Sequence, residues 1–346
     1  MSPAKSPSSE IIAIYRSLIS LSLLLTLLTV VLSAYIRLAE VGIGCEDWPG
    51  CYAQLDPGVE KKGITVLTPQ GRDMAHYGAR VAHRYIASIL GLFIVAIFAV
   101  ALRQGKDRST SLLVPMAIFA ITVFLSLLGY YTPTRSNPLI TMGNLLGGMA
   151  LLGLLWWLLQ RETEGAEVYT PQAGLRPLAL VALALVIMQI VLGGWSSANY
   201  ASANCPGLIS CEGDIFRPDY LADAFNPLRR ITLDEHGQVI RPDSLAVLSI
   251  AHRLFALLTA GYLAWLVRKM KPQPLLAGTV IALSLFSIGQ LVVGISAVWF
   301  QLPLLLLTLH NCLAALLLLG CINLLHRLAP PAASPPPGLP PAHRPR

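Results

Sequence analysis

Charged side chains are scarce in this chain of 346 residues, since Asp, Glu, Lys and Arg together make up only 12% of it. A typical soluble domain is about 25% charged, so the composition argues against a soluble enzyme. Cysteine is also scarce, at six residues, which excludes a small disulfide scaffold, and the 55% of hydrophobic residues exclude a disordered or collagen-like chain. The mean hydropathy of +0.63 favours a membrane protein instead.

Long apolar runs dominate the remainder of the sequence. Eight of them approach the roughly 20 residues that one membrane-spanning helix needs. The first has an apolar run too long for the core of a signal peptide, which favours an uncleaved anchor. We therefore predict an all-α integral membrane protein with eight transmembrane helices in the lipid bilayer. The predicted spans lie at about residues 18–35, 82–102, 112–131, 139–159, 177–196, 245–267, 275–298 and 303–325.

Basic residues outnumber acidic ones, 25 against 18, and many of them lie in the short links between the apolar runs. This arrangement indicates membrane topology rather than nucleic-acid binding, because the positive-inside rule places short basic links in the cytoplasm. Both termini are then cytoplasmic, in the cell inner (plasma) membrane, and the long links at about 41–75 and 198–243 face outward. The basic residues of the short links are Arg103, Lys106, Arg108, Arg161, Arg176, Arg268, Lys269 and Lys271.

The two halves of the chain repeat the same order of features. Each half has an outer loop in which two cysteines enclose five residues, CEDWPGC in the first and CPGLISC in the second. VAHRYIASILG resembles IAHRLFALLTAG, and LLGYYTPTRSNPL resembles VVGISAVWFQLPL. Four spans per half preserve the membrane orientation, so the repeats are parallel. We predict two pseudo-symmetric four-helix bundles, at 1–160 and 161–328, followed by a disordered proline-rich tail at 329–346.

Three histidines lie at a similar predicted depth in the outer leaflet: His83, His252 and His310. A charged residue at a helix centre costs on the order of 2.5–3.5 kcal/mol, so ionisable groups there need partners. Two histidines that face each other across a four-helix bundle can bind a heme iron from both sides, which His252 and His310 fit. Arg253 lies nearer the interface, where it could pair with heme propionates. The alternative is that the histidines only hydrogen-bond between helices. A zinc site is disfavoured because no Cys, Asp or Glu lies at their depth.

The first half offers fewer ligands. His83 and Arg84 repeat the His-Arg pair, but the fourth span contains no histidine, and Asn144 is the residue most nearly opposite His83. Asparagine is not a usual ligand of heme iron. The glycines of GNLLGG in this span leave space either for a flat macrocycle or for close helix packing.

Four of the six cysteines lie in the two outward loops. An outer loop meets an oxidising compartment, so we predict structural disulfides between Cys45 and Cys51 and between Cys205 and Cys211. Redox-active pairs that exchange with a partner thiol are the alternative. The other two cysteines, at 312 and 321, lie in the eighth span and are predicted to be buried packing residues.

These segments together resemble the heme A synthase family. The likeness is close in QIVLGGWSSANYASANCPG, AHRLFAL and LPLLLLTLHNCLAALLLL of the second half, and YIRLAEVGIGCEDWPGC and AHRYIASILGL carry it in the first. It covers nearly the whole chain outside the termini. The resemblance implies two pseudo-symmetric bundles of four helices each and an oxidoreductase that supports cytochrome c oxidase assembly.

The resemblance also implies particular sites and chemistry. Heme b is expected between His252 and His310, and the substrate heme O is expected in the first half, between His83 and the position held by Asn144. The reaction oxidises a porphyrin methyl group to a formyl group, with water as the source of oxygen. Further expected partners are a heme O synthase and an electron acceptor, and homo-oligomerisation is left open.

Two positions depart from the family pattern. The family has a Glu three residues before the second-span histidine, where this chain has Arg80, and it has a histidine where this chain has Asn144. A carboxylate beside the substrate has a clear use in removing protons, so these departures favour an alternative: a non-catalytic b-type heme protein of the same fold. An oxidoreductase that acts through the outer cysteines is a third hypothesis. Arg80 and Arg84 lie close to one face of the second span and could bind propionates, and His76 upstream could supply an axial ligand.

Overall fold

The computed structural model describes residues 7–38, 70–103, 112–131, 137–163, 174–211, 217–232, 240–271 and 273–329. Within these ranges every regular element is a helix, in agreement with the predicted all-α class. The predictions made for Cys45, Cys51 and the tail from residue 330 onward lie outside the described residues.

Long helices account for most of the described chain. Seven of them are long and apolar enough to cross a membrane, while the described apolar part of α4, Leu113–Gly129, is shorter. The helices extend beyond the predicted apolar spans, because backbone hydrogen bonding continues where the side chains become polar: α1 begins at Pro7 and α3 at Gln70. The eight long helices are α1 Pro7–Leu38, α3 Gln70–Arg103, α4 Leu113–Tyr131, α5 Pro138–Thr163, α6 Leu175–Ala198, α8 Ala246–Met270, α9 Ala277–Trp299 and α10 Leu304–Arg327.

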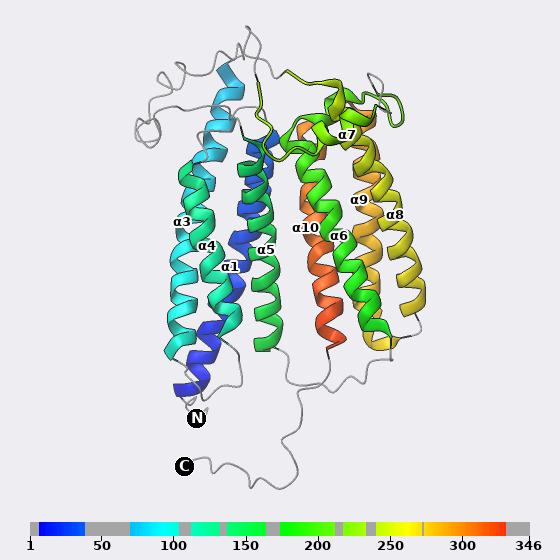
Figure 1. Cartoon of the computed structure of the whole chain (residues 1–346). Coiled ribbons are helices and arrows are strands. Elements are labelled where there is room, and N and C mark those ends of the chain that lie inside the picture. The colour runs from blue at the N-terminus through cyan, green and yellow to red at the C-terminus, as the bar shows by residue number, and fades with distance from the viewer. Residues whose placement is uncertain are drawn as a thin grey trace.

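The long helices pack in two groups of four (Figure 1). In the N-terminal group, α1 and α4 each contact α3 and α5, so α3 and α5 stand on one diagonal. In the C-terminal group, α6 and α9 each contact α8 and α10, so α8 and α10 stand on one diagonal. The two groups meet where α10 packs against α1 and α5, and where α5 packs against α6.

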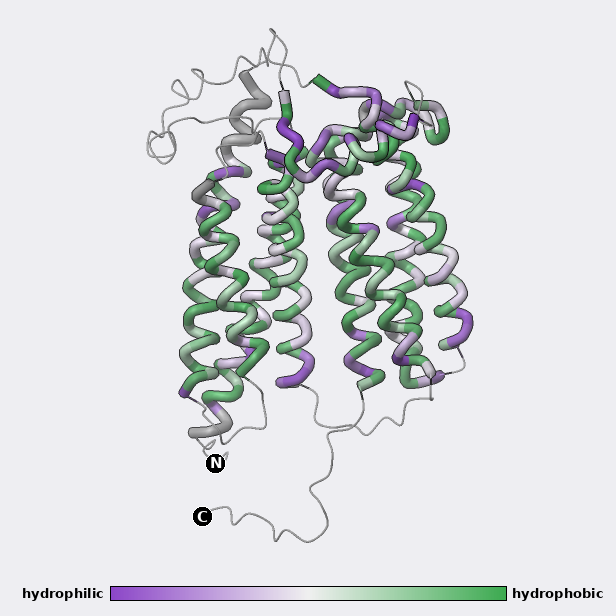
Figure 2. Tube along the Cα trace, in the orientation of Figure 1, coloured by the Kyte–Doolittle hydropathy of each residue, from purple (hydrophilic) through white to green (hydrophobic). Residues whose placement is uncertain are grey.

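The outward faces of the helices are apolar. Figure 2 shows hydrophobic residues along the middle of the helices, with hydrophilic residues gathered towards their ends. Leu92 is 70% exposed, Leu257 is 66% exposed and Leu305 is 78% exposed. Such large apolar side chains are stable on a protein surface when lipid covers them.

One end of the helical groups carries the basic helix termini. Arg103, Arg161 and Arg268 lie in the last turns of α3, α5 and α8. These helices end on the side of the molecule where α1 begins (Figure 1). The arrangement agrees with the sequence argument that groups these residues on one side of the membrane.

A folded segment covers the other end of the C-terminal group. It contains the 3-10 helix η3 Ala201–Asn204, the short helix α7 Pro218–Ala224 and the 3-10 helix η4 Asp243–Leu245. The indole Nε1 of Trp195 donates to the carbonyl of Ala224 (2.9 Å) and fixes α7 to the end of α6. The predicted outer loop at 198–243 is therefore partly helical and packed onto the bundle.

Candidate functional site

His252 and His310 face each other across the C-terminal group. Counted from Ala246 and Leu304, each is the seventh residue of its helix, and the two helices stand on the diagonal of the group. The centres of the two imidazole rings are 6.4 Å apart, and the ring planes are 78° to one another. The structure thus brings together the two residues that sequence reasoning placed at equal depth.

This spacing fits a metal ion held between the two rings. When each imidazole nitrogen lies about 2 Å from a metal ion, two rings on opposite sides have centres about 6 Å apart. Nδ1 of His310 is buried and has no hydrogen-bond partner in the described part of the chain, so it is a polar atom that lacks a partner. Among the described residues no group of three or more His, Cys, Asp and Glu side chains could hold a metal. Two axial ligands to a heme iron need no such group.

A glutamine from a neighbouring helix binds each histidine. Nε2 of Gln189, on α6, lies 3.0 Å from Nδ1 of His252 and also donates to the backbone carbonyl of that residue (3.2 Å). Nε2 of Gln290, on α9, lies 3.0 Å from Nε2 of His310. Sequence reasoning missed both glutamines, although they open two similar segments, QIVLG and QLVVG.

A glycine one turn after each glutamine makes room for the ring. A Cβ atom on Gly193 would lie 2.7 Å from Cε1 of His252, and one on Gly294 would lie 2.9 Å from Cε1 of His310. Residues four apart lie on the same face of a helix, so Gln and Gly act together on each ring. We call Gln189 with Gly193, and Gln290 with Gly294, the two Gln-Gly brackets.

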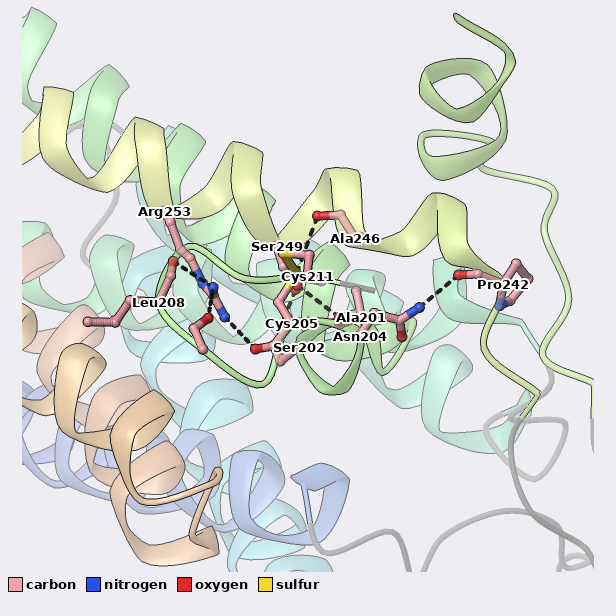
Figure 3. Close-up of a disulfide and its surroundings, with 12 residues drawn as sticks. Ala201, Ser202, Asn204, Cys205, Leu208, Cys211, Pro242, Ala246, Ser249 and Arg253 are labelled. Atoms are coloured by element: carbon pink, nitrogen blue, oxygen red, sulfur yellow. Dashed lines mark hydrogen bonds between the residues drawn. A yellow bond between two sulfur atoms is a disulfide. The ribbon is translucent and has the colours of Figure 1, made fainter. Parts of the chain in front are cut away.

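Arg253 fastens the outer loop that covers this site. Its Nη1 donates to the carbonyls of Gly207 (2.6 Å) and Leu208 (2.8 Å), and its Nη2 donates to the carbonyl of Cys205 (3.0 Å). Figure 3 shows the guanidinium turned towards the loop, beside the disulfide that joins Cys205 to Cys211. The residue predicted to pair with propionates is therefore engaged with backbone carbonyls in this structure.

The two cysteines of α10 differ in burial. Cys321 is fully buried, as expected for a packing residue, but Cys312 is only partly buried. The expectation that both are buried is therefore wrong for Cys312.

The candidate residues of the N-terminal group lie on α3 and α5. His83 and Arg80 are half-buried on α3 and Arg84 is exposed there, whereas Asn144 is half-buried on α5, the helix diagonally across. Asn144 donates from Nδ2 to the carbonyl of Ile140 in its own helix (3.2 Å). These residues therefore occupy the same diagonal of their group as His252 and His310 do in the other.

The glycines of α5 serve helix packing in this structure. A Cβ atom on Gly143 would lie 2.7 Å from Leu128, and one on Gly147 would lie 2.6 Å from Leu125, both on α4. In this structure leucine side chains of α4 therefore occupy the space beside these two glycines. The leucine atoms that such a Cβ atom would contact lie at the ends of flexible side chains.

Comparison with known proteins finds one family over most of the chain. Residues 16–322 match the family model COX15-CtaA, described as cytochrome oxidase assembly protein. A heme A synthase of Shewanella oneidensis is 35% identical over 318 residues, which cover 89% of this chain and 94% of the relative. A heme A synthase of Flavobacterium psychrophilum is 23% identical over 260 residues, 71% of this chain and 73% of the relative.

Proposed function

The chain belongs to the cytochrome oxidase assembly protein family, and we propose that it is a membrane-bound heme A synthase that converts heme O to heme A. The matched region contains His83, His252 and His310, which lie on α3, α8 and α10. The observation that supports the proposal most directly is the pair of imidazoles 6.4 Å apart on α8 and α10. Such a pair is suited to hold a heme near the electron-transfer path of an oxidoreductase.

The proposed reaction is an oxidation of a carbon–hydrogen centre. A methyl group of the porphyrin gains one oxygen atom from water and becomes a formyl group, and the electrons removed pass to an acceptor. The protons released need a base or a chain of polar groups to leave a low-dielectric site. The protein supplies the binding sites, the orientation of the substrate edge and the exclusion of bulk water.

We assign heme b to the C-terminal group, where His252 and His310 would hold its iron. When bound there, heme b supplies reversible one-electron transfer. Arg253 holds the disulfide loop over the outer end of this site through three carbonyls. Its pairing with a propionate would require some of these hydrogen bonds to be exchanged for a salt bridge, in which both partners are charged.

We assign the substrate heme O to the N-terminal group. His83 on α3 is the candidate axial residue, Asn144 on α5 lies diagonally across, and Arg80 and Arg84 can pair with carboxylates of the substrate. Leu125 and Leu128 fill the space beside the α5 glycines, and rotation of their side chains would open room for the ring system. A substrate that enters and leaves needs side chains that can move aside in this way.

The proposed membrane arrangement has eight spans in two parallel repeats. The basic helix ends face the cytoplasm of the inner membrane, together with both termini. The disulfide loop and α7 then face the outer compartment, where disulfides persist.

The substitutions in the N-terminal group support one alternative. Arg80 and Asn144 stand where the resemblance implies Glu and His, so a b-type heme protein without synthase activity is the second candidate. It would bind heme b in the C-terminal group and handle heme during oxidase assembly.

Co-expression with a heme O synthase, in a host that makes no heme A, separates the two functions. A synthase gives heme A in the membrane extract, seen as the formyl-porphyrin band in the pyridine spectrum. Heme b alone, at one per chain, supports the second candidate and contradicts the first. The Shewanella oneidensis relative, expressed in the same host, is the positive control for the assay.

A further inference from the structure

The two Gln-Gly brackets give the histidines of the C-terminal group similar surroundings, although Gln189 lies nearest Nδ1 of His252 and Gln290 lies nearest Nε2 of His310. In each bracket a neighbouring helix offers one amide to a ring nitrogen and, one turn later, a glycine that leaves space for the ring edge. The two brackets come from different helices, α6 and α9, which stand on the other diagonal of the group. Each ring is therefore contacted from the side by a helix that is adjacent to its own.

The amides have unused hydrogen-bonding capacity. Oε1 of Gln189 and Oε1 of Gln290 are both buried and have no hydrogen-bond partner within the described ranges. A carboxamide can donate through its nitrogen or accept through its oxygen, and a half-turn of its end exchanges the two. Leucine could do neither, and a carboxylate could only accept.

An imidazole that binds iron through one nitrogen carries its proton on the other. That proton needs an acceptor, and the acceptor fixes both the tautomer and the rotation of the ring. We propose that Gln189 and Gln290 are the positioning residues for the two axial histidines, each accepting the N–H of its ring through Oε1 when heme is bound. This inference rests on the proposed heme b site and adds the residues that orient its ligands.

The N-terminal group has no counterpart of the brackets. When the two cysteine pairs are aligned, Thr29 takes the position of Gln189, and when LLGYYTPTRSNPL is aligned with VVGISAVWFQLPL, Leu125 takes the position of Gln290. The hydroxyl of Thr29 donates to the carbonyl of Leu25 in its own helix (2.7 Å), and Leu125 packs against Gly147. Brackets confined to one group match a resident cofactor there and an exchangeable substrate in the other.

The test measures the bound heme rather than turnover. Purified wild-type protein is compared with Gln189→Leu, Gln290→Leu and the corresponding Glu variants by heme content, low-spin electron paramagnetic resonance and midpoint potential. We expect the Leu variants to hold heme b about 10- to 100-fold more weakly and at a raised potential, because the ligands lose their acceptor. The Glu variants keep a stronger acceptor, so they should retain heme b at a potential below that of the wild type.

The control is Gln160→Leu, which removes another buried glutamine amide, on α5. It should leave the heme content, the resonance signal and the potential unchanged. Leu and Glu variants with the wild-type potential and signal would overturn the positioning role while leaving the heme b site intact. A wild-type protein without low-spin heme would overturn the heme b site itself. If a Leu variant fails to fold, the direction of the shift in the Glu variants decides.

Discussion

The two helical groups share an arrangement of four helices but differ in the residues that surround their candidate iron ligands. In the C-terminal group two histidines face each other on diagonal helices, and each is held by a Gln-Gly bracket. In the N-terminal group the corresponding diagonal carries His83 and Asn144. Leucine side chains of α4 occupy the space beside the neighbouring glycines of α5. This difference is in keeping with the proposed functions, a bound heme b in the C-terminal group and an exchangeable substrate in the N-terminal group.

The groups also meet at a defined polar contact. Nη2 of Arg37, at the end of α1, donates to Oδ1 of Asn311 on α10 (2.9 Å), directly beside His310 in the sequence. Gly194 of α6 lies against Leu145 of α5. The larger apolar cluster accordingly includes residues of α5 together with the C-terminal helices. The two groups are therefore joined by direct side-chain contacts of α1 and α5 with α6 and α10.

The largest expected effect comes from removing an axial histidine. We expect His252→Ala and His310→Ala each to abolish the low-spin b-type spectrum, since one imidazole cannot provide two axial ligands. His83→Ala should leave this spectrum in place. The visible and resonance spectra of the purified variants measure both outcomes, and a surviving low-spin signal in either of the first two would refute the ligand assignment.

The next largest effect is expected when the glycine of a Gln-Gly bracket is replaced by alanine. Gly193→Ala and Gly294→Ala place a Cβ atom 2.7 and 2.9 Å from a histidine carbon, so the ring must move from its position. Heme b retention should fall about 10-fold or more, as for other changes to ligand-orienting residues. Gly278→Ala on α9 meets no atom within 4 Å and is the matched control. Alanine favours a helix over glycine by about 1 kcal/mol, so helix instability would not explain a loss.

The equivalence of the two groups can be tested by placing a histidine in the N-terminal group at the position that corresponds to His310. Asn144 is the seventh residue of α5, counted from Pro138, as His310 is of α10. Asn144→His should add a low-spin heme and raise the ratio of heme to protein, because it completes a pair with His83 on diagonal helices. The pyridine spectrum measures the ratio, and Asn144→Gln is the control. An unchanged ratio would mean that the diagonals of the two groups are not equivalent.

The smallest expected effect concerns the outer loop. Arg253→Ala removes three hydrogen bonds from a charged group to loop carbonyls, at a cost of roughly 1.5–3 kcal/mol in the free energy of unfolding. Arg217→Ala, which breaks the exposed Arg217–Asp219 pair, is the control, because loss of a surface ion pair costs about 0–1 kcal/mol. Thermal unfolding in detergent and the rate of Cys205–Cys211 reduction by added thiol measure the difference. Equal behaviour of the two Arg variants would contradict the fastening role of Arg253.

Part of the site could be found from sequence because a histidine in an apolar span is costly and therefore conspicuous. His252 and His310 stood out on that ground, and their equal depth followed from the helix starts. Gln189 and Gln290 did not stand out, since a neutral amide costs less to bury and many partners can satisfy it. Their role depends on which face of α6 and α9 turns towards α8 and α10.

The sequence by itself determined the membrane class, the family, the repeated order of sequence motifs and the histidines that are candidate iron ligands, because each follows from local hydropathy, spacing and residue chemistry. The tertiary structure alone decided that α8 and α10 stand on one diagonal, that Gln189 and Gln290 bracket the rings, and that the α5 glycines pack against α4. Hydropathy reports how deep a helix lies but not its rotation about its axis. That rotation is set by close packing between helices remote in sequence.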